Sequence, residues 1–296
     1  MIKLKVGFTI VVMLAIGFSH AQKYTDLFSV SEQYSPNNLF KSGNAKCTIQ
    51  DQNLAAKAPI KINATDFVLV GFSANRLTFS GDSLPGGSSF LATTLQVGYI
   101  ANFGRYNITA VALPKVSSDF AEVTHHSFQM GGLLIFSVKY SDNFKLKYGC
   151  YYNQEFFGPL IVPIIGLDWK VNENLRIFGN LPITATAEYT LSKRFSTGIF
   201  FNANTCSYLY DKQKQYIHKS TQEISAFGDF YLTKNIVFQT KLGFTLGRKY
   251  DLFNLSDKID AKLFAEIGDN RTQLNSNTLK DGFIGEFKLI FRVPTP

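Results

Sequence analysis

Residues 128–140 read FQMGGLLIFSVKY, and apolar and polar side chains alternate along most of this stretch. One parity is apolar or glycine throughout: Phe128, Met130, Gly132, Leu134, Phe136, Val138 and Tyr140. The other parity is mainly polar, although Leu133 and Ile135 interrupt it. Because successive side chains of a β-strand face opposite ways, this period of two predicts a strand with one apolar face.

The same period recurs along the chain, over 236–246, 259–267 and 283–293. The alternating segments run for roughly 8 to 14 residues, which is long enough for a tilted strand to cross a bilayer. No convincing amphipathic helix follows the first 21 residues. The pattern predicts an all-β protein, and a soluble β-sandwich shares the requirement for one apolar face.

The connections between these segments alternate in character, which favours a barrel over a sandwich. Tight turns are predicted near 101–104, 141–143, 172–174, 192–193, 233–235 and 256–258. The intervening connections are predicted near 114–126, 154–159, 180–183, 208–220, 247–249 and 269–281, and three of them are long. Short turns on one rim and longer loops on the other are typical of outer-membrane barrels. We therefore predict a transmembrane antiparallel up-and-down β-barrel of about 14 strands, within a range of 12 to 16, counted from residue 66.

Composition agrees with this class and excludes several others. The chain has 296 residues, of which 45% are hydrophobic, 15% aromatic and 18% charged, with Phe alone contributing 28. Such a chain is too apolar for a disordered protein, and 3 cysteines are too few for a disulfide scaffold. A helical membrane protein needs several apolar runs of about 20 residues, whereas the apolar runs here are short apart from one at the N-terminus.

The N-terminus has the order of a secretory signal peptide. Lys3 and Lys5 precede an apolar stretch over 6–18, and Ser19-His20-Ala21 follows it. We expect cleavage after Ala21, which leaves 22–65 as an N-terminal segment and 66–296 as the barrel. Residues 22–65 are expected to add strands to the barrel or to form a periplasmic or plugging segment.

If the apolar parity faces lipid, the other parity lines the lumen. The predicted lumen-lining charged residues are Lys139, Lys145, Lys147, Asp168, Lys170, Arg176, Glu188, Glu223, Asp229, Lys241, Asp260, Lys262, Glu266, Glu286, Lys288 and Arg292. Buried charges of both signs are tolerable only when they are paired or hydrated. Two interpretations remain open: a lumen held shut by salt bridges, and a narrow polar pore.

Catalytic signals are weak. Gly81-Asp82-Ser83-Leu84 matches the short motif of one esterase class, but no histidine has the aspartate three residues before it that this class requires. His126 and Ser127 are adjacent, so in an extended strand they face opposite ways. His125 and His126 lie near Asp119 and Glu122 without a metal-binding spacing. We expect no enzyme activity, cofactor or metal, and no nucleic-acid partner.

Several motifs carry a family resemblance: Gly158-Pro159-Leu160, the run IIGLDWK over 164–170, LSKRF over 191–195, GRKY over 247–250 and DKID over 257–260. They resemble an uncharacterised outer-membrane β-barrel family common in Bacteroidetes-type bacteria, a domain of unknown function. The resemblance covers most of residues 66–293. It implies the barrel fold and the outer-membrane location and assigns no site residues.

The sequence thus predicts an integral, porin-like protein of a Gram-negative outer membrane, either a narrow passive pore or a structural surface protein. Its expected partners are membrane lipid, lipopolysaccharide and, through the last strand, the barrel-assembly machinery. The oligomeric state stays open. The alternatives are a secreted β-sandwich binding module and an outer-membrane lipid esterase or deacylase that uses Ser83 and His126.

Overall fold

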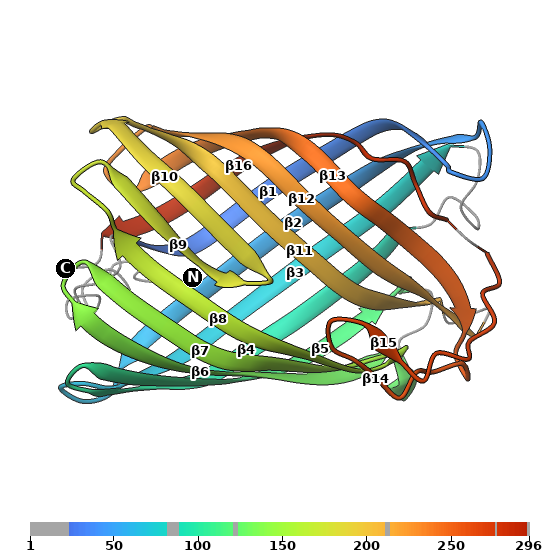
Figure 1. The fold of residues 1–296 in the computed structure, drawn as a ribbon, viewed down its shortest axis with the longest axis horizontal. Helices are drawn as coiled ribbons and strands as arrows, with labels where there is room; N and C mark the ends of the chain where they lie inside the picture. The colour runs from blue at the N-terminus through green and yellow to red at the C-terminus, as the bar shows by residue number, and fades with distance from the viewer. Residues whose placement is uncertain (1–23, 82–88, 121–123, 211–213, 276, 295–296) are drawn as a thin grey trace, which may run out of the picture.

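The computed structural model describes residues 24–81, 89–120, 124–210, 214–275 and 277–294, so the predicted signal peptide lies outside the described residues. Within these ranges, 14 antiparallel strands close into a barrel (Figure 1). They are β1 (Tyr24–Leu39), β2 (Lys46–Lys61), β3 (Phe67–Gly81), β4 (Ser89–Phe103), β5 (Tyr106–Ser118), β6 (Phe128–Ser141), β7 (Phe144–Glu155), β8 (Gly158–Lys170), β9 (Leu175–Leu181), β10 (Thr184–Ser192), β11 (Phe195–Tyr210), β12 (Gln215–Tyr231), β13 (Ile236–Asn254) and β16 (Gly282–Pro294).

Each wall strand pairs with the neighbouring wall strands in the chain, and the pairing of the last strand, β16, with the first, β1, closes the ring. β16 joins β1, from Tyr24 opposite Pro294 to Tyr34 opposite Gly285, and it joins β13 on its other edge. β8 joins β9 from Ile165 to Lys170. A closed ring of this kind excludes the two-sheet sandwich, and no helix of the described residues is long and apolar enough to cross a membrane.

The predicted strand number is confirmed, but two of the strands differ from those counted. β1 and β2 come from within 22–65 and belong to the wall, whereas β3 begins at Phe67. The strand predicted over 259–267 is not a wall strand. Only the two-residue strands β14 (Ala261–Lys262) and β15 (Glu266–Ile267) form there, within a long segment that links β13 to β16.

Three predicted connections also need correction. Most of the connection predicted over 208–220 lies in wall strands, because β11 runs to Tyr210 and β12 begins at Gln215. Residues 247–249 lie inside β13, where Gly247 adopts a φ of 58° and the register with β12 shifts by one residue. Glycine accommodates this left-handed conformation, so the chain forms a β-bulge there and the strand continues. The turn predicted at 256–258 lies in the segment between β13 and β16, which we call the 255–281 segment.

The two rims of the barrel differ, as predicted. At one rim, the turn end, the strands are joined by residues 62–66, 104–105, 142–143, 171–174, 193–194 and 232–235. At the opposite rim, the loop end, the 255–281 segment is the longest connection between wall strands, and the structure describes it except for residue 276. The connection over 119–127 includes the 3-10 helix η1 (His125–Ser127). The β9–β10 hairpin does not reach the loop end: its turn lies partway along the wall (Figure 1).

The outer face of the wall is apolar, as the alternation predicts. On β6, Leu134 is 56% exposed, whereas Gln129 and Ser137 of the other parity are buried inside. Among the exposed aromatic residues, Tyr140, Trp169 and Tyr189 lie near the turn end of β6, β8 and β10, and Phe128 and Phe283 lie near the loop end of β6 and β16. An apolar band edged by aromatic side chains is typical of a barrel surface in contact with a bilayer.

Candidate functional site in the barrel lumen

Ion pairs brace the lumen near the turn end. Arg176 of β9 forms two hydrogen bonds to the Asp168 carboxylate of β8, at 2.8 and 2.7 Å, and both side chains are buried. Arg292 of β16 bridges Asp229 of β12 at 2.7 Å and Asp26 of β1 at 2.6 Å. Such bidentate and branched contacts satisfy charges that would otherwise be costly to bury.

Most of the predicted lumen-lining residues of the wall join this bracing. Lys241 pairs with Glu286 at 3.1 Å, the Tyr24 hydroxyl donates to Glu188 at 2.6 Å, and Gln33 donates to Glu223 at 3.1 Å. Lys288 lies half-buried beside Gln239. Lys139 and Lys170 lie at the rim, where they pair with Asp142 and Glu173 of the adjoining turns. Lys145 and Lys147 lie on β7, partly buried, with Lys145 opposite Asp168.

Further along the lumen, a second polar group links opposite parts of the wall. Lys219 of β12 donates to Asp51 of β2 at 2.8 Å, and the Tyr208 hydroxyl donates to Asn75 at 2.6 Å. Arg248, almost fully buried, donates to Ser35 at 3.0 Å and also to Asn38. Sequence reasoning missed these residues because 22–65 was not divided into strands and because Lys219 and Arg248 fell within predicted connections.

An apolar cluster closes the lumen at the loop end. It is formed by inward-facing side chains of β2, β3, β4, β11, β12 and β13 together with Phe40 and Leu279 of the connections. Its members are Phe40, Cys47, Ile49, Leu77, Phe79, Phe90, Tyr208, Ile217, Tyr250, Leu252 and Leu279. Phe79 packs edge-on against Tyr250, with ring centroids 5.0 Å apart. A straight path along the barrel axis therefore ends in a packed core.

The wall is pinched beside this cluster. The end of β5 reaches β11 directly: Ser118 pairs with Leu209, and the Ser117 hydroxyl donates to the Ser207 carbonyl at 2.9 Å. The buried Glu155 of β7 accepts hydrogen bonds from the backbone and hydroxyl of Ser207, at 2.7 and 2.6 Å, and pairs with Lys115 at 3.0 Å. β6, β7 and β8 therefore curl outside the unpaired edge of β11.

A gap in strand pairing lies between the turn of the β9–β10 hairpin and this pinch. β8 pairs with β9 only from Ile165 onward, and β11 pairs with β10 only up to Asn202. The edges of β8 over 158–164 and of β11 over 203–208 therefore face each other without a shared ladder. We call this opening the side gap. Its limit on the hairpin side is the hydrogen bond from Ala203 N to Ile183 O, 2.8 Å long.

Behind the side gap lies a cavity of about 810 Å³, which we call the side cavity. Its inner wall is mostly apolar and comes from inward-facing positions of β3 and β5–β8: Leu69, Val111, Leu113, Leu133, Ile135, Tyr151, Leu160, Val162 and Ile164. Asn180, Pro182, Ile183, Ala203, Asn204 and Thr205 line it at the side gap. Leu133 and Ile135, which interrupted the polar parity of β6, are thus explained.

The 255–281 segment borders the side cavity and is fastened to the wall beside it. Lys262 pairs with Leu160 of β8, and Ile259 N donates to Phe157 O at 2.8 Å. The tip of the β14–β15 hairpin, Leu263 and Phe264, lines the cavity, and Phe264 is 79% exposed. The residues Asp260, Lys262 and Glu266, which were predicted to line the lumen, therefore belong to this segment, and Asp260 is exposed.

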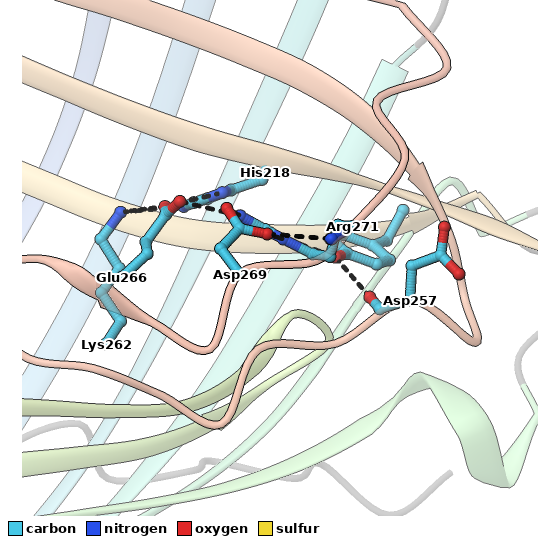
Figure 2. A network of polar contacts seen from close by, with 7 residues as sticks. His218, Asp257, Lys262, Glu266, Asp269 and Arg271 are labelled. Atoms are coloured by element: carbon cyan, nitrogen blue, oxygen red, sulfur yellow. Dashed lines mark hydrogen bonds and ion pairs between the residues drawn. The ribbon is translucent and has the colours of Figure 1, made fainter.

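A polar network holds the segment against the outer-parity face of β12 (Figure 2). Glu266 accepts from Lys262 and from Arg271, both at 2.9 Å, and lies 3.7 Å from His218 of β12. Arg271 also pairs with Asp269 at 2.8 Å, and its hydrogen bonds hold the pKa of Asp269 well below the usual value. Lys262, Glu266 and His218 were not expected to interact, because 259–267 was predicted as a separate wall strand.

The weak catalytic and metal-binding motifs lie partly outside the described residues. His125 and His126 lie in η1 at the loop end, and Ser83 and Glu122 lie outside the described residues. In the part of the chain that the structure describes, His, Cys, Asp and Glu form no group of three or more that could hold a metal ion.

The geometry defines a class: a closed antiparallel β-barrel with an apolar outer face, a braced lumen and a cavity that opens through the wall. The chain belongs to the family described as DUF6268, a domain of unknown function, whose model matches residues 87–278. This match confirms the resemblance to an uncharacterised barrel family. No curated protein matches the sequence.

Solved structures with a similar fold include outer-membrane channels. One from Pseudomonas putida F1 has 9% sequence identity and a TM-score of 0.46, over 94% of this chain and 100% of that chain. The P. putida toluene transporter TodX has 9% identity and a TM-score of 0.42, over 90% and 89%. The NanC porin has 7% identity and a TM-score of 0.38, over 90% and 100%. These likenesses concern the barrel fold alone.

Proposed function

We propose that the protein is an integral outer-membrane β-barrel that lets a small solute pass passively and carries out no chemistry of its own. The observation that carries this proposal is the side cavity of about 810 Å³, enclosed by a wall whose outer face is apolar. Cavities of this size hold molecules of small-ligand size. The apolar outer band and its aromatic edge support a location in a bilayer.

The route, in this proposal, is not a straight water-filled pore. The apolar cluster occupies the lumen at the loop end, and the ion pairs occupy much of the lumen at the turn end. A packed apolar core excludes the water that a moving ion needs, so steady ion flow through the native barrel is not expected. This distinguishes the protein from a general porin.

We further propose that lipid and lipopolysaccharide contact the outer band, and that β16 is the strand engaged by the barrel-assembly machinery. The position of β16 supports this proposal, because the strand pairs with both β13 and β1 and so completes the ring. A cleaved signal peptide over 1–21 would deliver the chain across the inner membrane.

The proposed passage is tested by single-channel recording of the refolded protein in planar bilayers. The native barrel is expected to show no steady conductance. The double substitution Phe79→Ser with Phe90→Ser removes two aromatic side chains of the apolar cluster. It is expected to produce discrete conductance steps because water can then enter the loop end. The matched control is Phe72→Ser with Leu95→Ser, a pair on the outer face of the same two strands, which is expected to stay silent.

Heat-modifiable migration on gels first establishes that each variant is a folded barrel. Steady conductance of the native protein would contradict the closure of the loop end. Silence of the folded Phe79→Ser, Phe90→Ser variant would contradict a passage through the lumen and favour a purely structural role.

A further inference from the structure

We infer that the side cavity is a binding site for a small, mainly apolar molecule with one hydrogen-bond donor, and that this molecule enters sideways from the membrane through the side gap. The inference rests on the proposed function, because it requires the barrel to lie in a bilayer. It adds the class of solute and the direction from which it comes.

The lining of the cavity sets the class of the ligand. Leu133 of β6, Tyr151 of β7 and Val162 of β8 lie opposite one another in register, so they form one row of the cavity wall. Aliphatic and aromatic side chains dominate this inner wall, whereas the rest of the lining includes polar side chains of Gln96, Thr109, Ser220, Gln222 and Lys262. Binding sites of this kind bury the apolar body of a ligand and use a few polar groups to orient it.

One polar atom in the cavity wall lacks a partner. The Asn180 side-chain oxygen is buried and accepts no hydrogen bond from the described residues. A buried acceptor without a donor costs free energy. This oxygen lies against Gly166, so a ligand can donate to it, and recover that free energy, once the Asn180 side chain turns toward the cavity. Asn180 lies on β9 beside the side gap, opposite Gly166 of β8. The hydroxyl or amide end of a ligand would therefore lie near the opening and its apolar body deeper in the cavity.

The surroundings of the side gap set the direction of entry. Ile165 and Leu181 form the last residue pair between β8 and β9 before the gap, and both face outward, 64% and 50% exposed. On β6, exposed Phe128 and Met130 extend the apolar outer face to the loop end of that strand. On β3, by contrast, exposed Arg76 ends the apolar band earlier. The apolar outer face of β6 thus extends further toward the loop end than that of β3.

The axial route offers no comparable entrance. The apolar cluster closes the loop end, and the pinch between β5 and β11 separates that cluster from the side cavity. In this proposal the side gap therefore faces membrane lipid. A solute must partition into the membrane before it binds. The apolar hairpin tip, Leu263 and Phe264, suits such an entrance because it is exposed and borders the cavity.

The test is photolabelling of the full-length protein in lipid nanodiscs with a medium-chain alkyl diazirine that bears a terminal hydroxyl, followed by mass spectrometry. We expect labelling of Tyr151, which faces the cavity. The variant Leu133→Trp with Val162→Trp fills the cavity on both sides of Tyr151 and is expected to lose this label. The control Leu134→Trp with Tyr148→Trp, on the outer faces of β6 and β7 and away from the side gap, is expected to keep it.

Two further probes separate the routes and the sources. A charged, membrane-impermeant diazirine is expected to label the exposed connections and to spare Tyr151; labelling of Tyr151 by this probe would overturn entry from the membrane. Phospholipids with a diazirine in the acyl chain are expected to label only the outer face. Strong labelling of Tyr151 by such lipids would overturn a small solute as the occupant.

The outcome is distinguishable from failure of the proposed function. A chain that does not form a heat-modifiable barrel in nanodiscs contradicts the membrane barrel itself. A folded barrel that is labelled by the hydroxyl probe on Leu134 and Ile165 but not on Tyr151 contradicts only the side cavity as a binding site.

Discussion

At the residue scale, the buried charges in the lumen are stabilised by arginine side chains that each make several well-placed contacts. Arg292 contacts the carboxylates of Asp229 and Asp26 and lies over the Tyr24 ring, with its guanidinium carbon 3.7 Å from the ring centroid. Arg176 likewise stacks on Phe178 while it pairs with Asp168. Arginine suits these positions because its planar group can pair with carboxylates and stack on an aromatic face at once.

Removing Arg292 is expected to destabilise the barrel strongly. Arg292→Ala leaves Asp229, which is fully buried, without its cationic partner, and breaking a buried pair in this way costs about 3–5 kcal/mol. Lys193→Ala, at an exposed turn, is the control and is expected to change the free energy of unfolding by less than about 0.5 kcal/mol. Urea unfolding in lipid vesicles measures both; equal effects of the two substitutions would contradict the bracing role of Arg292.

At the element scale, the 255–281 segment depends on Arg271 for its attachment. This side chain lies over the Phe253 ring, with 4.2 Å between the guanidinium carbon and the centroid, and it pairs with Glu266 and Asp269. Its guanidinium also donates to the Tyr216 hydroxyl at 3.3 Å. A single residue of the segment thus contacts β12, β13 and two of the acidic residues labelled in Figure 2, Glu266 and Asp269.

This attachment is expected to depend on pH only under acidic conditions. The pKa of Asp269 is lowered in the folded protein by its hydrogen bonds from Arg271. A lowered carboxyl pKa contributes stability that is fully present above the unfolded value of about 3.9 and is lost as the pH falls through the folded value. The deuterium uptake of the segment, corrected for the intrinsic exchange rate, should therefore stay constant between pH 8 and 5, because the carboxyl group titrates only below about 4. The uptake should rise in more acidic buffer.

A substitution provides the complementary check. Arg271→Met is expected to raise deuterium uptake of the segment already at neutral pH, whereas Lys258→Met, at an exposed position of the same segment, is expected to leave it unchanged. If Arg271→Met exchanged like the native protein, another contact would have to hold the segment.

At the scale of the whole molecule, side-chain parity accounts for the barrel, and strand pairing accounts for its interior. Alternation along β6 and β16 was enough to predict the outer face, because successive side chains of one strand point to opposite faces of the sheet. The side gap depends on where β9 and β10 stop relative to β8 and β11, which no single strand records. The one local signal for the side cavity was the pair Leu133 and Ile135 on the otherwise polar face.

The errors have equally local causes. The alternation over 259–267 is that of a strand, but Ile259 is buried against Phe157 while Leu263 and Ile267 stay exposed, so the segment packs beside the wall without joining it. Residues Asp51, Lys219 and Arg248 could be placed in the lumen only after β2, β12 and β13 had been given their full lengths. Contacts between strands far apart in the chain decide such features.

The central claim is that the wall spans a bilayer with the apolar parity outward. A nitroxide scan of β6 over 128–140 tests it most directly, with one label per variant in lipid vesicles and Cys47, Cys150 and Cys206 replaced by Ser. The account predicts a period of two, with high accessibility to oxygen at Met130, Leu134 and Phe136 and low accessibility at Gln129, Ser137 and Lys139. Loss of this period, or ready access of a water-soluble relaxation agent to Leu134, would contradict it.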